Sequence, residues 1–179
     1  MKKRILLWQL GSFLFIVGLG IILHFLYDWT NKSIFFAPYS AVNESIWEHM
    51  KILFFPMFFI AIIESFFLKE INNFWTIKLK GILIGVLFIP ICYYVYSGII
   101  GTSYDWLNIL IFIVAAFIST FYEYRELIRK TEIEDNNSQA LFLIAIFAIF
   151  FIIFTFNPPS LNIFKDPVSG LYGIHLLLF

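Results

Sequence analysis

The chain has 179 residues, of which 61% are hydrophobic, 13% are charged and 24 are Phe. An ordinary soluble domain is about 45–50% apolar and about 25% charged, so a soluble fold could not bury this much apolar surface. Twelve Lys and Arg residues balance twelve Asp and Glu residues, which argues against the basic patch of a nucleic-acid-binding protein. We therefore expect an all-α integral membrane protein, a single domain over residues 1–179 whose main partner is the lipid bilayer.

Five apolar segments are long enough to cross a membrane, which takes about 20 residues in a helix. The first segment follows Lys2, Lys3 and Arg4, as the apolar region of a signal peptide would. Its apolar stretch is too long for that region, and no small-residue cleavage site follows Tyr27, so we expect a retained span. The five predicted spans cover residues 5–27, 50–68, 79–100, 106–122 and 140–156.

The positions of Lys and Arg predict the orientation of this five-helix bundle. Nine of the twelve lie beside span ends on one side, and only Lys32, Lys51 and Lys165 lie on the other. Because Lys and Arg accumulate in cytoplasmic loops, the N-terminus is predicted to be cytoplasmic and the C-terminal tail to lie outside. We expect a multi-pass protein of the cell membrane, with an outer loop and helix start at residues 28–49 and an outer tail at residues 157–179.

Two features of the inner half have a structural and a functional interpretation. Residues 123–139 hold most of the mixed charge and are expected to form a solvated loop. Glu64, near the inner end of the second span, is expected to reach the cytoplasmic interface, or else to act as a proton or cation relay in a transporter. Gly81 and Gly85 are spaced as a pair that permits close helix packing.

All three histidines fall on the predicted outer side. His24 and Asp28 are four residues apart, so they share one face of the first helix, and His175 lies in the tail. Imidazole and carboxylate groups can bind a divalent metal such as zinc, and we expect these three residues as candidate ligands. The single cysteine, Cys92, excludes a zinc site built on cysteine pairs.

The densest polar stretch on the outer side runs from residue 41 to residue 51. Ser45 and Glu48 have the spacing of a capping box, which predicts that a helix starts here. The cap does not require His49, and Glu44 shares a helical face with Glu48. We therefore expect Glu44, Glu48 and His49 to be catalytic, with Glu48 or His49 as the general base.

Four further polar or aromatic residues are predicted to bind a substrate at this face: Asn43 and Trp47 in the same stretch, Asp105 after the loop between spans three and four, and Asp166 in the tail. The tail contains Pro and Gly turn signals, and we expect it to fold over the outer face as a lid.

Several segments resemble a family of small bacterial polytopic membrane proteins of unknown function. The most specific is Val-Asn-Glu-Ser-Ile-Trp-Glu-His at residues 42–49; the others lie at residues 23–27, 93–101, 158–159, 164–167 and 170–173. The resemblance implies a multi-pass membrane protein and adds no mechanism. The chain departs from the family pattern at Ala41, where a Pro is expected.

Two functions follow from these observations. The first is an outward-facing cavity of His and carboxylate groups that binds a lipid or envelope-derived substrate, as a metal-dependent or acid/base hydrolase or transferase. The alternative is a non-enzymatic component for solute binding, transport or support of a partner.

Overall fold

The computed structural model describes residues 1–129 and 136–174. All five of its long helices are long and apolar enough to cross a membrane. Within the described residues, the only β-structure is an isolated antiparallel bridge between Lys165 and Tyr172. The predicted all-α fold with five candidate spans is confirmed. The helices are α1 (Lys2–Trp29), α2 (Ile46–Phe67), α3 (Phe74–Ile100), α4 (Asp105–Ile128) and α5 (Asn137–Phe156), followed by the short 3₁₀ helix η1 (Asn162–Phe164).

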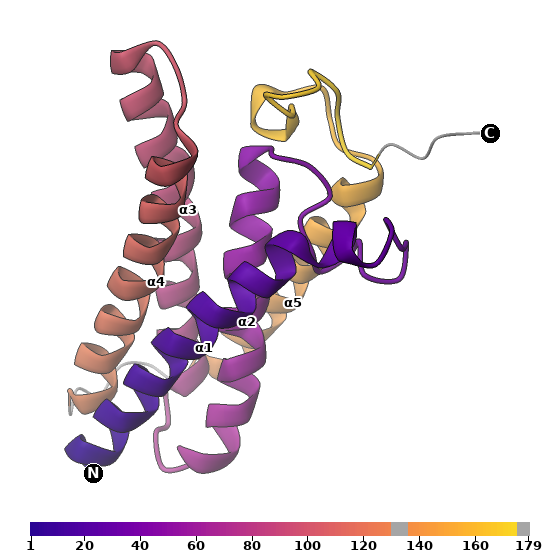
Figure 1. Cartoon of the computed structure of the whole chain (residues 1–179). Helices are drawn as coiled ribbons and strands as arrows, with labels where there is room; N and C mark the ends of the chain where they lie inside the picture. The colour runs from indigo at the N-terminus through magenta and orange to yellow at the C-terminus, as the bar shows by residue number, and fades with distance from the viewer. Residues whose placement is uncertain (130–135, 175–179) are drawn as a thin grey trace.

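Successive helices run in opposite directions, so the bundle has two distinct ends (Figure 1). We call the end where α1 stops and α2 starts the histidine end, and the end that holds Met1 and the link between α2 and α3 the N-terminal end. In Figure 1, α3 and α4 lie side by side at the left, and α1 crosses in front of α2. Gly101 ends α3 with φ +80°, a left-handed conformation that glycine adopts without strain.

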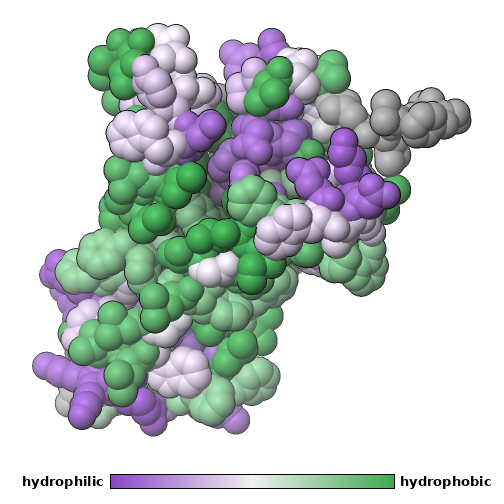
Figure 2. All heavy atoms as spheres, viewed as in Figure 1, coloured by the Kyte–Doolittle hydropathy of each residue, from purple (hydrophilic) through white to green (hydrophobic). Residues whose placement is uncertain are grey.

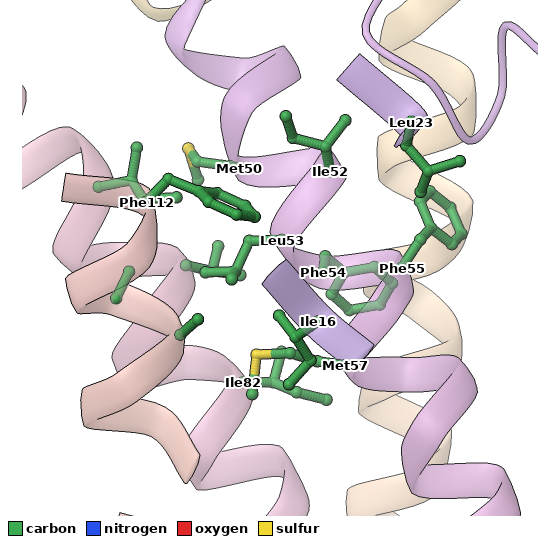
Figure 3. Packing of buried hydrophobic residues seen from close by; sticks show 14 of the residues in the cluster. Ile16, Leu23, Met50, Ile52, Leu53, Phe54, Phe55, Met57, Ile82 and Phe112 are labelled. Atoms are coloured by element: carbon green, nitrogen blue, oxygen red, sulfur yellow. The ribbon is translucent and has the colours of Figure 1, made fainter. Parts of the chain in front are cut away.

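The helix α2 lies at the centre of the bundle. It contacts all four other helices, and 61% of its most apolar stretch is buried, against 22–33% for the others. Figure 3 shows its side chains Leu53 and Met57 packed beside Ile16 of α1, Ile82 of α3 and Phe112 of α4. Helix α2 therefore contributes more apolar side chains to the main core than any other helix.

Small residues allow the neighbouring helices to approach closely. A Cβ atom added at Gly85 of α3 would lie 2.2 Å from Ser119 Oγ of α4, and one added at Gly81 would lie 2.6 Å from Glu123 Cγ. The spacing of these two glycines predicted such an approach. Gly20 of α1 does the same against α4, where an added Cβ would lie 2.3 Å from Phe112 Cζ.

Large apolar side chains cover the outside of the bundle. Leu14, Ile91 and Phe142, on three different helices, are 69%, 61% and 65% exposed. Figure 2 shows hydrophobic residues in a broad band across the middle of one face, with hydrophilic residues gathered below it and at its upper right. Such a surface suits contact with lipid chains, because a bilayer core is as apolar as these side chains.

Two expectations for the inner half are wrong. Glu64 does not reach an interface, since it is fully buried and contacts Lys78. Glu123 is not part of a solvated loop, since it lies within α4 and is 2% exposed. Both carboxylates face the same buried lysine, which offers them a partner inside the bundle. Residues 130–135 of the expected loop lie outside the described residues.

The close crossing of α1 and α4 predicts that Gly20→Ala destabilises the protein. Overpacking a tight site costs about 1–3 kcal/mol, so the unfolding temperature should fall by several degrees. Gly18→Ala is the matched control, because an added Cβ there meets nothing within 4 Å and alanine favours the helix. Thermal unfolding in detergent measures both. Equal unfolding temperatures for the two variants would contradict a close contact between Gly20 and α4.

Candidate functional site

The start of α2 is capped in a way that frees a carboxylate. Ser45 is the N-cap, and its hydroxyl accepts a hydrogen bond from Glu48 N at 3.4 Å. In a full capping box the Glu side chain would bond the backbone N–H of Ser45 in return. Here that N–H donates to Asn43 Oδ1 at 2.9 Å instead. The predicted box is therefore half formed, and the Glu48 carboxylate is available for other partners.

Glu48 anchors the segment that precedes α2. Its Oε2 accepts a hydrogen bond from Val42 N at 3.0 Å and lies 2.5 Å from Lys51 Nζ. The lysine is fully buried and also donates to the Ala37 carbonyl at 3.0 Å and to Thr155 Oγ1 of α5 at 2.7 Å. One buried ion pair thus ties together α2, α5 and the loop after α1.

The tail is fastened to the same segment. Asn43 Nδ2 donates to the Gly173 carbonyl at 3.0 Å, and Ile174 N donates to the Thr155 carbonyl at 3.0 Å. Gly173 has φ +64°, and a Cβ there would lie 2.8 Å from Pro158 Cδ, so only glycine fits this position without strain. Asn43 therefore joins the tail to the start of α2.

These anchors on both sides of Glu44 hold its side chain between two histidines. Glu44 Oε1 lies 3.7 Å from His24 Nε2, and its Oε2 lies 3.6 Å from His49 Nε2. The two imidazole rings are 5.5 Å apart, centre to centre. Helix α1 supplies His24 near its end, helix α2 supplies His49 in its first turn, and the loop between these helices supplies the Glu44 carboxylate. We call these three residues the histidine site.

The hydrogen bonds of His49 leave one ring nitrogen free to bind a ligand. Its Nδ1 lies 2.9 Å from the carbonyl oxygen of Ser45, which can only accept. Nδ1 therefore carries the hydrogen, and Nε2 of the neutral ring presents a lone pair towards Glu44. Metal-binding histidines are commonly oriented in this way, by a carbonyl that accepts from the other ring nitrogen.

The histidine site has the donor atoms and the spacing of a metal centre. Its three ligand atoms all lie within 4.8 Å of one another. Tetrahedral zinc holds its ligands at about 2.0–2.2 Å, which places them roughly 3.4 Å apart, so a small contraction would suffice. His24 and His49 are 24% and 18% exposed and Glu44 is 50% exposed, so the site opens to the surface on the side of the carboxylate. Two neutral imidazoles and one carboxylate carry a single negative charge, which favours a cation.

Three other predicted site residues, Asp28, Asp105 and Asp166, supply no ligand atom to this group. Asp28 is exposed on the last turn of α1, and Asp105 is exposed in the first turn of α4. Asp166 is buried in a turn, where its carboxylate accepts from Val168 N at 3.0 Å and Ser169 Oγ at 2.5 Å. The predicted metal ligand His175 lies outside the described residues.

Trp47 packs into an aromatic cluster that fixes the tail. Its ring centre lies 4.5 Å from that of Phe151 and 4.7 Å from that of Phe164 in η1. The tail thus covers the start of α2, the face over which a lid was expected. The indole N–H of Trp47 is buried and has no hydrogen-bond partner among the described residues.

Sequence reasoning missed three buried charged residues. From the sequence, Lys51 is expected as an outer surface charge, Lys78 as an inner one, and Glu123 as part of a loop. For Lys51 the signal was its position three residues after Glu48, since such residues are neighbours on a helix. For Lys78 and Glu123 the signal was that they lie, together with Glu64, near the ends of three spans on the same side of the bundle, where opposite charges can meet.

Comparisons with known proteins give a family and no activity. The chain matches the model described as "Family of unknown function (DUF6512)" over residues 2–174. Neither the curated proteins nor the solved structures include a match to it.

The anchor at the start of α2 predicts that Lys51→Met is strongly destabilising. It leaves the Glu48 carboxylate buried without its cation, which costs about 3–5 kcal/mol and should lower the unfolding temperature by roughly 10 °C. Adding Glu48→Gln should restore much of the loss, because the amide oxygen can still accept from Val42 N without a charge. Thermal unfolding of the single and double variants checks this. A double variant no more stable than Lys51→Met would contradict the pairing.

Proposed function

The chain belongs to the family of unknown function DUF6512, and from its own residues we propose that it is a multi-pass membrane protein that binds a divalent transition metal ion of the zinc class at the histidine site. His24 Nε2, His49 Nε2 and the Glu44 carboxylate are the ligands. With three protein ligands, the fourth coordination position stays open for water or substrate, as in catalytic zinc sites. The protein is then a hydrolase or transferase acting on a lipid or envelope-derived substrate.

One observation carries the proposal: two histidines and a carboxylate from three separate segments converge within 4.8 Å. The buried Nδ1 of His24 has no hydrogen-bond partner among the described residues, so packing against Phe25 and His49 orients this ring without a hydrogen bond on Nδ1. A ligand on Nε2 would hold it. Glu44 is also half exposed, although its two neighbours along the chain are tied down by hydrogen bonds.

The open side of the site suits chemistry at a membrane surface. Zinc lowers the pKa of bound water to about 7 and polarises carbonyl or phosphoryl oxygens, which supports ester or phosphoester cleavage at neutral pH. Glu48, proposed from the sequence as a base, is buried and paired with Lys51, so we assign it to positioning Glu44. His49 and Glu44 keep a direct role, as metal ligands.

The second candidate is a non-enzymatic transport or accessory component. It is favoured by the other polar groups at the histidine end, since Asn43, Glu48 and Asp166 all have hydrogen-bond partners. In such a protein a metal at the histidine site would be structural or cargo. Turnover of lipid esters or phosphoesters by the zinc-loaded protein, absent from the metal-free protein, distinguishes the enzyme from this alternative.

Metal binding can be measured directly on the purified protein. We expect about one zinc ion per chain by elemental analysis after dialysis against zinc, and an unfolding temperature that rises with free zinc, since a ligand of the folded state stabilises it. His24→Ala, His49→Ala and Glu44→Gln should each lower zinc affinity at least tenfold.

Asp105→Asn is the matched control, because this residue is acidic, exposed and at the histidine end, but outside the histidine site. It should bind zinc as the unmodified protein does. Equal zinc affinity in all four variants would rule out the histidine site. Zinc binding without turnover would leave a metal site and reject the enzyme.

The proposed orientation places the histidine end outside the cell. In a Cys92→Ala background, Lys32→Cys at this end should react with a membrane-impermeant maleimide in intact cells. Lys69→Cys, which is also exposed but at the N-terminal end, should react only after the membrane is opened. The reverse pattern would place the histidine site in the cytoplasm.

A further inference from the structure

The N-terminal half of the bundle contains a buried cluster with unbalanced charge. Lys78 of α3 is in ion-pair contact with Glu64 of α2 and with Glu123 of α4. The three side chains are no more than 2% exposed. Two carboxylates and one ammonium group leave one negative charge without a partner. We call these residues the lysine triad.

The neighbours of the lysine triad add hydrogen bonds but no charge. From α1, Gln9 Nε2 and Ser12 Oγ both donate to Glu64 Oε1 at 2.8 Å. Glu64 thus has two neutral donors in addition to its ion-pair contact with Lys78, whereas within the part of the chain that the structure describes the Glu123 carboxylate accepts a hydrogen bond from Lys78 alone. A Cβ atom added at Gly81 would lie 2.5 Å from Glu123 Oε1, so position 81 of α3 has no room for a side chain that could donate to this oxygen.

The buried pair of Glu48 and Lys51 is a second charged cluster in this chain, and its charges are balanced. These side chains are as deeply buried as the lysine triad, but one carboxylate meets one ammonium group. In the lysine triad, by contrast, an ionised second carboxylate would lie in an apolar interior without a cation. A buried carboxylate in that position takes up a proton instead, because an unpaired buried charge is far more costly than a neutral acid.

We propose that the lysine triad binds one exchangeable proton, shared between the two carboxylates and held mainly by Glu123. Glu123 is the preferred position because its carboxylate has no neutral donor among the described residues, whereas Gln9 and Ser12 both donate to Glu64. A metal or sodium ion fits less well than a proton, since Lys78 Nζ already lies between the carboxylates and would repel a second cation. The proposal is independent of the histidine site, which lies at the other end of α2.

The lysine triad lies close to the N-terminal end of the bundle. Glu64, Lys78 and Glu123 lie three, four and five residues from the ends of their helices, or roughly 5–8 Å at 1.5 Å per residue. A small group of apolar residues lies at this end of the bundle, consisting of Ile5, Leu68, Phe74, Ile77 and Leu127. Gln9 also lines a groove of about 190 Å³ between α1 and α4, and its Oε1 is buried without a partner.

A bound proton inside a membrane-spanning bundle is a functional feature. Ionisable groups at such positions commonly serve proton relays and proton-coupled transport. Whichever role the protein has at its histidine site, the lysine triad gives it a group that can take up and release one proton.

Infrared spectroscopy of the full chain in lipid nanodiscs, with isotope-labelled glutamate, tests the proposal. At about pH 6 exposed glutamates are still ionised, since their pKa is near 4.3, so a protonated glutamate band must come from a buried side chain. We expect one protonated glutamate per chain, with a band that shifts after transfer into D₂O. No band in any buffer, or a band unaffected by D₂O, would overturn the proposal.

Variants assign the infrared band to residues, because each substitution changes the number of protons that the lysine triad binds. Glu64→Gln and Glu123→Gln should each abolish it, because one carboxylate then balances Lys78. Lys78→Met should double it, because both carboxylates then become neutral. Glu70→Gln is the matched control, since this exposed glutamate lies at the same end and pairs with Arg4.

The measurement on the unmodified protein stands even if a variant fails to fold. A band that is missing in sodium buffer and appears in choline buffer would assign the missing charge to sodium and overturn the proton. Persistence of the band in both Glu64→Gln and Glu123→Gln would also overturn it. Loss of zinc binding at the histidine site would leave this result unchanged, so the two proposals fail separately.

Discussion

Charged groups on the central helix can be buried only if they find charged or polar partners inside the protein, and this requirement determines much of the arrangement. Near its start α2 carries Glu48 and Lys51, which reach the loop after α1 and Thr155 of α5. Near its end it carries Glu64, which reaches α1 through Gln9 and α3 through Lys78. Lys78 in turn contacts α4. Polar contacts therefore link α2, directly or through one residue, to all four other helices.

This use of polar groups suits a bundle in lipid. Apolar side chains gain little by packing against one another instead of against lipid chains, so they do not decide which helices become neighbours. Close packing and hydrogen bonds decide which helices become neighbours. Gly20, Gly81 and Gly85 provide the close packing, and the buried ion pairs provide specific partners. At the histidine end the same anchors hold the loop that carries Glu44, so the site depends on the pairing of Glu48.

The sequence was sufficient to predict the number and class of the helices, because a long apolar segment needs no tertiary information to be identified. It also identified the start of α2, since Ser45 and Glu48 form a local signal. The histidine site was only partly predictable. His24, Glu44 and His49 were each singled out, but which carboxylate lies between the histidines depends on how the loop folds back. That fold rests on the Val42–Glu48 and Asn43–Gly173 hydrogen bonds, which link residues from separate segments.

The expectations that Glu64 reaches the interface and that Glu123 lies in a solvated loop were wrong for a related reason. A charge near the end of an apolar segment is expected to reach the interface, and for a single helix in lipid this is the cheaper solution. Glu64, Lys78 and Glu123 escape that rule because three helices bring them together. Their depths along separate spans were available from the sequence, but the order in which the helices pack was not.

A purely structural role accounts for only part of the lysine triad. Buried ion pairs are weak sources of stability, and apolar residues of similar size often replace them without loss. Specific pairing of helices would explain one lysine and one glutamate, as at Glu48 and Lys51. The second glutamate adds a charge that the lysine cannot neutralise, and it lies where Gly81 leaves no room for a side chain on α3. A neutral glutamine at position 123 would satisfy a structural role equally well. Glutamine could not take up and release a proton, whereas glutamate can. This difference between the two side chains is the physical argument for a proton at Glu123.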